Sequence, residues 1–169
     1  MDVSGLLEEL FSRVDEHVTA VLEGLSADEL NRAPEEGSNP IGWLVWHLAR
    51  VADMHIAEIR EVDQLWVSDG WAGRFGLEPD PWNMGYGHTP EQVAEIRPDG
   101  TRVLQDYWNA VRDRTQAVLA EADPASLDEI VDRRWDPPVT LGVRLVSIAD
   151  DAIQHAGQAA YVKGLLTRR

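Results

Sequence analysis

The sequence predicts an all-α protein, a four-helix bundle in which residues 1–169 form one domain. Apolar residues recur every three or four positions in four long stretches, and this is the period of an α-helix. The chain is long enough to bury one sizeable core, and no Pro-, Gly- or Ser-rich linker divides it. We therefore expect four long helices packed around a single core.

The first two helices show the clearest apolar periodicity. We expect the first from Val3 to about Leu25, with its apolar side chains on one face. The second starts at Pro40, a residue that suits the first turn of a helix, and runs to about Glu61. Its inward-facing residues are expected to be Ile41, Leu44, Leu48 and Val51.

A long excursion follows the second helix. Residues 62–88 are rich in Gly, Pro and Trp and have no sustained period, so we expect an irregular segment with one short helix near Trp71 to Phe75. Loops of this length in compact proteins are often functional. Five tryptophans could wall a substrate pocket, although packing is the commoner role for any one of them: Trp43, Trp46, Trp66, Trp71 and Trp82.

The third helix opens with a capping signal at residues 89–92, Thr-Pro-Glu-Gln. Residues 98–100, Pro-Asp-Gly, should kink or interrupt it before it continues to about Glu121. Residues 124–139 then form a second connection, for which we expect a short helix at residues 126–131.

The fourth helix carries the most informative pair of residues. We expect this helix from a cap at Thr140 to about Leu166. Asp151 and His155 lie about 6 Å apart along its axis and about 40° apart around it, so they can share one metal ion. With Gln158 they continue an apolar stripe made by Leu141, Leu145, Ile148 and Val162, and we expect them to face the core. A buried charge needs a partner, so something should compensate these side chains.

A catalytic metal site of the zinc type has about three protein ligands and one open position. His47 is the best candidate for the third ligand, because it lies beside the buried stripe of the second helix. His55 is a rival, but it is about 12 Å along and about 80° around the helix from His47, so the two should not share an ion. Spacing alone leaves open a hydrogen-bonded core histidine at His47, and a simple hydrogen-bonded pair of Asp151 with His155.

Gln158 and His88 each have two interpretations, and His17 has one. Gln158 could hydrogen-bond a ligand side chain, or it could be an ordinary polar residue of the bundle. His88 could line the mouth of the pocket, but we favour the interpretation that it merely precedes the helix cap at Thr89. His17 is expected at the surface.

The composition excludes several classes of partner and chemistry. With 30 acidic and 15 basic residues, the net charge of -15 repels nucleic acid and anionic membranes, so neither is expected as a partner. The N-terminus lacks a signal-peptide pattern, and no stretch is apolar enough to span a membrane, so we expect a cytoplasmic protein. The chain has no cysteine; any thiol chemistry must therefore use an external thiol.

Three stretches of the chain resemble the DinB-like superfamily, which also contains the mycothiol-dependent maleylpyruvate isomerases. They are residues 24–31 (GLSADELN), residues 38–51 (SNPIGWLVWHLARV), and Asp151-x-x-x-His155 followed by Ala-Gly-Gln. The resemblance runs along nearly the whole chain. It implies a four-helix bundle in which His47, Asp151 and His155 bind a divalent metal ion, most often zinc or nickel. Many members have His at the position of Asp151, whereas the mycothiol-dependent isomerases are similar to this chain in having an acidic residue there. A carboxylate also suits manganese or iron(II).

The same resemblance implies that the protein is a metal-dependent transferase or isomerase. Such an enzyme would use a low-molecular-weight thiol of the mycothiol type as cosubstrate and act on small electrophiles. Three alternatives stay open: a metal-dependent hydrolase, a non-catalytic metal-binding stress-response protein, and a metal-free interaction bundle. An open coordination position facing a pocket would favour catalysis, and a closed site would favour the non-catalytic protein. The expected partners are a small electrophile and a thiol. The sequence does not distinguish a monomer from a homodimer, and the resemblance allows a homodimer.

Overall fold

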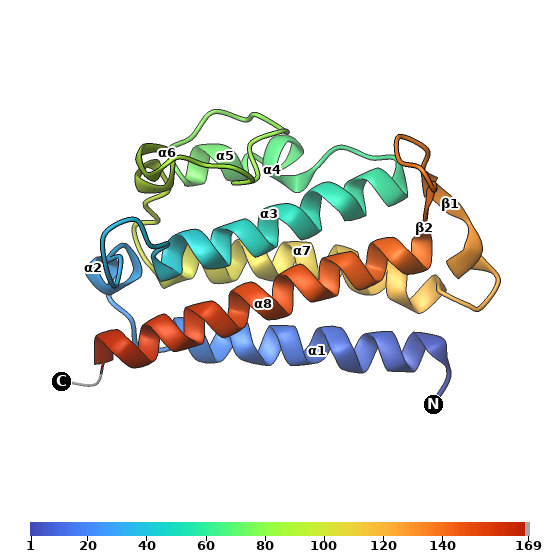
Figure 1. Ribbon diagram of the computed structural model, residues 1–169, viewed down its shortest axis with the longest axis horizontal. Helices are drawn as coiled ribbons and strands as arrows, with labels where there is room; N and C mark the ends of the chain where they lie inside the picture. The colour runs from blue at the N-terminus through green and yellow to red at the C-terminus, as the bar shows by residue number, and fades with distance from the viewer. Residues whose placement is uncertain (168–169) are drawn as a thin grey trace.

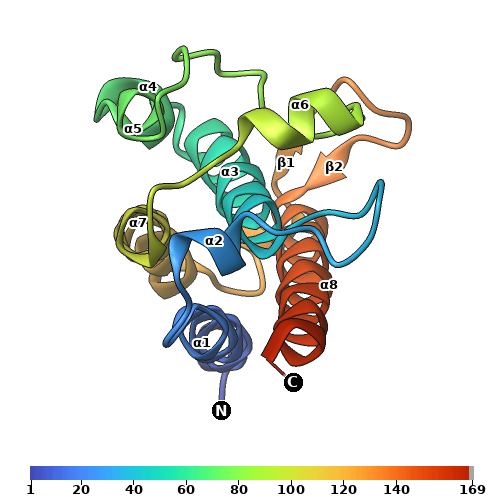
Figure 2. The ribbon, with the colours of Figure 1, turned by 90° about the vertical axis from the view of Figure 1, so that its left-hand side faces the viewer.

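The computed structural model describes residues 1–167, and four long helices form a bundle in it (Figure 1). They are α1 (Val3–Leu22), α3 (Ile41–Arg60), α7 (Thr101–Glu121) and α8 (Leu141–Thr167). Viewed end-on, the four helices occupy the corners of a quadrilateral (Figure 2). The predicted all-α class and the four-helix bundle are confirmed.

The shorter elements lie in the connections. They are α2 (Ala27–Leu30), α4 (Leu65–Ser68), α5 (Trp71–Arg74), α6 (Pro90–Glu95), the 3-10 helix η1 (Ser126–Asp128), β1 (Ile130–Asp132) and β2 (Val139–Thr140). Helices α4, α5 and α6 lie over the outer side of α3 (Figures 1 and 2). None of the helices within residues 1–167 combines the length and the apolar composition that crossing a membrane requires.

The first helix ends earlier than predicted. It stops at Leu22 instead of near Leu25, because Gly24 adopts a left-handed conformation with φ 74° that ends the helical run. Ser26 then caps the separate helix α2 through a reciprocal pair of hydrogen bonds with Glu29. The interruption of the third helix is confirmed, and it separates α6 from α7.

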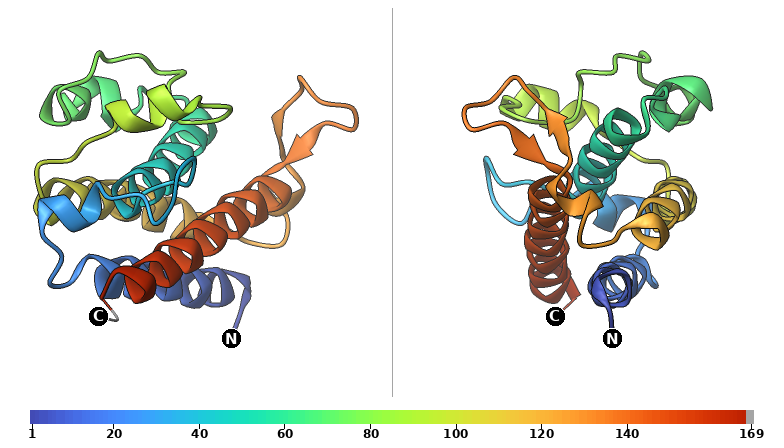
Figure 3. Two further views of the ribbon diagram at one scale, coloured as in Figure 1. Left: turned by 60° about the vertical axis from the view of Figure 1, so that its left-hand side comes forward. Right: turned by 90° about the vertical axis from the view of Figure 1, so that its right-hand side faces the viewer.

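The helix predicted over residues 126–131 is wrong beyond Asp128. The chain instead forms the strand β1, which pairs antiparallel with β2, Ile130 opposite Thr140. This hairpin has only two short strands, so it leaves no apolar alternation in the sequence that could reveal it. It projects from the N-terminal end of α8 (Figure 3).

Two buried residues of α3 attach the long excursion to the bundle. Arg50, with no exposed area, donates hydrogen bonds to the backbone carbonyls of Asn83 and Pro81, at 3.0 and 3.2 Å. Asp53, also fully buried, accepts from two backbone N–H groups at the start of α4 and from the Tyr107 hydroxyl. Arg50 and Asp53 also face each other at 3.4 Å. Because breaking a buried pair of this kind costs about 3–5 kcal/mol, these residues hold the excursion firmly over α3.

Candidate metal centre

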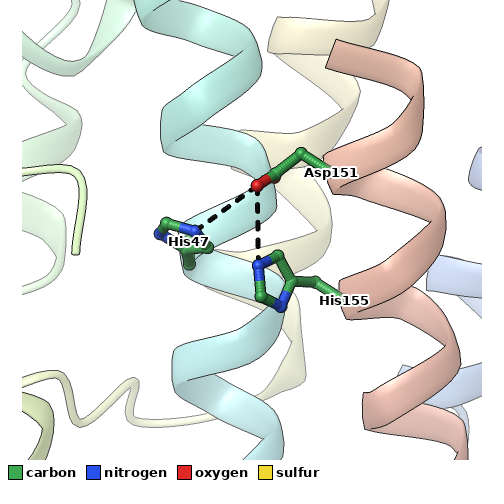
Figure 4. Close-up of side chains that lie close together, drawn as sticks. All are labelled: His47, Asp151 and His155. Carbon is green, nitrogen blue, oxygen red and sulfur yellow. Dashed lines mark ion pairs between the residues drawn. The ribbon is translucent and has the colours of Figure 1, made fainter. Parts of the chain in front are cut away.

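The three predicted ligands meet where α3 and α8 pack together. His47 extends from α3, and Asp151 and His155 extend from α8 toward it (Figure 4). The Nε2 atom of His47 lies 3.7 Å from Oδ1 of Asp151, and Nε2 of His155 lies 3.5 Å from the same oxygen. The three ligand atoms are all within 4.8 Å of one another. The structure thus brings together two residues of one helix and one residue that is about a hundred positions earlier.

The spacing of these atoms fits a divalent cation. Bonds of about 2.0–2.2 Å from a tetrahedral metal to nitrogen and oxygen ligands place neighbouring ligand atoms about 3.4 Å apart. The two measured distances from Asp151 Oδ1 are close to that value. The other oxygen of this carboxylate, Oδ2, is buried and has no hydrogen-bond partner. A buried anionic oxygen without a partner is costly, and a bound cation would compensate it.

The outer nitrogen of each imidazole is occupied by an oxygen acceptor. The Nδ1 atom of His47 bonds to the backbone carbonyl of Met84, and a carbonyl can only accept, so Nδ1 carries the hydrogen. The Nδ1–H of His155 donates to the amide oxygen of Gln158 at 2.9 Å. In the neutral imidazoles, both Nε2 atoms therefore have a free lone pair on the side of Asp151. This arrangement is typical of metal-binding histidines, and it confirms that Gln158 bonds to a candidate ligand.

The ring of His47 is held by Trp43 and by a glycine of the excursion. Trp43 stacks on the imidazole with 4.7 Å between ring centroids and 10° between planes. Gly85 has φ +99° and lies against both stacked rings, because a Cβ atom there would be 2.8 Å from Nδ1 of His47 and 2.9 Å from Trp43. Arg50 holds this same segment through the carbonyl of Asn83. Gly85 and the Met84 carbonyl were not identified from the sequence, because only the folded excursion brings them to the site.

The carboxylate and the imidazole of α8 perturb each other. Burial opposes the ionisation of Asp151, but the imidazoles of His155 and His47 that face the carboxylate outweigh it and lower the pKa of Asp151 to about 2. In turn, the nearby carboxylate of Asp151 raises the pKa of His155 against the effect of burial. Without a metal, the site therefore favours a protonated imidazole beside a carboxylate. A metal ion must compete with that proton, so its affinity should fall as the pH falls.

The prediction that Asp151, His155 and Gln158 face the core is wrong in part. Asp151 and His155 are half-buried and Gln158 is exposed. After Ile148 in the chain, four of the buried residues of α8 are small, namely Ala149, Ala152, Ala156 and Ala159. These alanines allow α8 to approach its neighbours closely, and the ligands lie at the edge of the buried face, beside α3.

A cavity of about 940 Å³ opens on one side of the site. His47 and Asp151 lie in its wall, and apolar side chains such as Val51 and Met54 line it further along α3. Trp82 and Trp135, which are 71% and 64% exposed, line the same cavity. Of the five tryptophans that could wall a pocket, Trp82 therefore lines this cavity, and Trp135 lines it in addition. The other four candidate tryptophans are at most 6% exposed and pack in the core: Trp43, Trp46, Trp66 and Trp71.

His55 lies in this cavity but does not join the three candidate ligands, as its spacing from His47 predicted. Its Nε2 atom lies 3.4 Å from Nη1 of Arg144. Burial, and then the charge of Arg144, lowers the pKa of His55 to about 4. It is therefore a neutral imidazole at physiological pH.

The two remaining histidines are placed outside the cavity. His88 directly precedes Thr89, the N-cap of α6, so the interpretation that it precedes the cap is confirmed. Its ring accepts a hydrogen bond from Nε1 of Trp43 at 3.3 Å and bonds to Oδ1 of Asn83 at 2.9 Å. His17 is exposed on α1, as predicted.

A family model described as the DinB superfamily matches residues 10–159. The chain belongs to the DinB superfamily. It is also similar to a crystal structure described as the conserved protein of locus from Enterococcus faecalis, with 34% identity and a TM-score of 0.90. That match covers 100% of this chain and 99% of the other. None of the curated proteins compared with the chain matches it. The function of this DinB-superfamily protein must therefore be inferred from its own site.

Proposed function

We propose that this protein is a divalent-metal-dependent enzyme that transfers a low-molecular-weight thiol to a small electrophile, or isomerises the electrophile with the help of the thiol. The observation that carries the proposal is a set of three ligands with the cavity on its open side. Within residues 1–167, the cluster around Asp151 holds three candidate ligands, whereas a closed structural site of the zinc type has four. Zinc and nickel suit its two imidazoles and one carboxylate.

The chain's own residues prepare the site for a thiol. When bound, a divalent cation would supply positive charge that lowers the pKa of a thiol at the open position. His47 and His155 present their Nε2 atoms in fixed orientations, because Met84 and Gln158 hold the opposite nitrogens. The chain has no cysteine, so no side-chain thiol competes for the same position.

The reaction forms a bond between the thiol sulfur and an electrophilic carbon, and the thiol proton passes to solvent. In a transfer, a leaving group departs with the bonding electron pair. In an isomerisation, the sulfur adds to a double bond conjugated with a carbonyl group, and the displaced electron pair moves to the carbonyl oxygen. The resulting carbon–carbon single bond rotates, the electron pair returns to re-form the double bond, and the sulfur–carbon bond breaks to release the thiolate. The apolar wall of the cavity limits the access of water to the nucleophile, and Trp82 and Trp135 offer flat surfaces to the electrophile.

The test uses protein purified without an affinity tag or chelator. Its zinc, nickel, manganese and iron contents are measured, and monochlorobimane is then offered together with mycothiol, glutathione or cysteine. We expect a stoichiometric metal ion and thiol-dependent conjugation in the parent. Both should be lost in His155→Ala and kept in His17→Ala, which removes an exposed imidazole remote from the site.

Other outcomes of this test would favour the alternatives. Hydrolysis of nitrophenyl esters in the absence of any thiol, lost in His155→Ala, would support a metal-dependent hydrolase. A bound metal without turnover of any substrate would support a non-catalytic metal-binding protein. Either result would contradict the thiol proposal.

A further inference from the structure

The cavity extends from the candidate metal ligands to a second group of polar residues. Arg144 precedes Asp151 by seven residues on α8, about 10 Å along the helix axis and about 20° around it. His55 follows His47 by eight residues on α3, about 12 Å along the axis. Because α3 and α8 run in opposite directions, both displacements point toward the hairpin (Figure 1). Arg144 and His55 therefore form a second layer of the same cavity.

The carboxylates of this second layer already have partners. Asp132 of the hairpin accepts from the backbone N–H and Nε of Arg134, each at 2.9 Å, and from Nη2 of Arg144 at 2.7 Å. The hydrogen bonds from Arg134 are the main reason why the pKa of Asp132 lies well below its usual range. Glu58 is paired with Arg134. An amine or another cationic ligand would find these acceptors occupied.

The donors of the second layer, in contrast, are not all used. Arg144 is only 8% exposed, and its Nε atom is buried without a hydrogen-bond partner. Where Nε2 of His55 accepts from Arg144, Nδ1 of His55 carries the hydrogen. This atom is buried and makes no hydrogen bond, although Oε2 of Glu58 lies 3.7 Å from it and 3.9 Å from Nη2 of Arg144. Because a buried donor without a hydrogen bond is costly, the cluster lacks an acceptor within hydrogen-bond distance of these two donors. A carboxylate is the ligand group whose geometry best matches a guanidinium.

We propose that the Arg144 and His55 end of the cavity binds a carboxylate of the substrate, whose electrophilic carbon lies at the His47, Asp151 and His155 end. The substrate class is therefore an electrophilic carboxylic acid with an apolar body, because Val51 and Met54 line the cavity between the two ends. This inference rests on the proposed function, and it specifies the substrate of that same site.

The test compares ligands that differ only at the end that would reach Arg144. Cobalt(II)-substituted protein is titrated with mercaptohexanoate and with mercaptohexanol, and binding is followed by the thiolate-to-cobalt absorption. Both thiols should produce this absorption, and the carboxylate should bind about tenfold more tightly. Equal affinities of mercaptohexanoate and mercaptohexanol would overturn the proposal.

Variants locate the effect at Arg144. Arg144→Gln should remove the advantage of the carboxylate and leave the affinity for mercaptohexanol unchanged. Arg144→Lys keeps a charge beside Asp132, guards against misfolding, and should keep part of the advantage. Arg60→Gln is the matched control, because Arg60 pairs with Glu121 outside the cavity. An undiminished advantage in Arg144→Gln would place the carboxylate elsewhere and overturn the assignment.

Failure of the proposed function would give a different result. If neither thiol produced the cobalt absorption, the thiol chemistry would be wrong, whatever binds at Arg144. Hexanoate and hexanamide would then be compared by calorimetry on the same protein. Tighter binding of hexanoate, lost in Arg144→Gln and kept in Arg60→Gln, would support the carboxylate site by itself, and equal binding would overturn it.

Discussion

Gly85→Ala is expected to damage both the stability of the protein and its affinity for metal. Gly85 contacts the imidazole of His47 from the excursion, next to the Met84 carbonyl that accepts from Nδ1 of His47. The new Cβ atom would lie 2.8 Å from that nitrogen, 2.9 Å from Trp43 and 3.1 Å from Trp46. None of these rings can move without disturbing the core, so the excursion or the imidazole must shift.

The magnitude follows from two separate costs. The left-handed backbone at φ +99° costs a non-glycine residue about 1–2 kcal/mol. Forcing a methyl group into a packed site costs about 1–3 kcal/mol more. We therefore expect the free energy of unfolding to fall by about 2–5 kcal/mol. Loss of the acceptor that orients a metal-binding histidine should also weaken metal affinity by about 10–100-fold.

Gly87→Ala is the matched control. Gly87 has φ +71°, so an alanine there has the same kind of backbone strain, but nothing lies within 4 Å of the new Cβ atom. It should lose only the backbone contribution to stability and bind metal like the parent. Urea unfolding measures the stability, and competition with a chromophoric chelator measures the zinc affinity. If Gly85→Ala is as stable as Gly87→Ala and binds zinc as tightly as the parent, the close contact at Gly85 does not hold the His47 ring in place.

Three further changes test other parts of the account. Gln158→Ala removes the acceptor of the His155 Nδ1–H and should weaken zinc affinity about tenfold in the same competition assay, with a parent-like affinity as the contrary result. His55 has a pKa of about 4 against about 6.5 unfolded, so metal-free protein should lose up to about 3 kcal/mol between pH 6.5 and 4, because the unfolded chain binds the extra proton. His55→Gln should reduce that loss in urea unfolding at several pH values; an unchanged pH profile would contradict it. Asp53→Asn leaves Arg50 as a buried charge without its carboxylate and should cost about 3–5 kcal/mol, whereas a loss below 1 kcal/mol would show that the pair does not anchor the excursion.

Local signals explain what could be predicted from the sequence. The second helix and the interrupted third helix could be predicted from proline positions, capping residues and a regular apolar period. All of these signals act within a few residues of the chain. Asp151 and His155 are one helical turn apart, so their proximity is a property of the helix itself. His47 could be added because it lies beside the buried stripe of its own helix.

What could not be predicted depends on contacts between distant parts of the chain. The hairpin that carries Asp132 and Trp135 has two very short strands, and its position beside the cavity is set by the packing of α8. Gly85 resembles any other loop glycine until the excursion folds onto His47. The incorrect prediction that Asp151 and His155 face the core has the same origin. The apolar stripe read from large residues of the sequence omits the alanines, which form the buried face of α8 there and leave Asp151 and His155 at its edge.

The most direct test of the metal site is anomalous diffraction from crystals of the protein, measured on both sides of the absorption edge of the metal found by elemental analysis. We expect one strong anomalous peak at bonding distance from Nε2 of His47, Nε2 of His155 and the carboxylate of Asp151, with one coordination position facing the cavity. A peak at another place, or no peak after soaking with zinc and with nickel, would contradict the central claim that these three residues form a metal site.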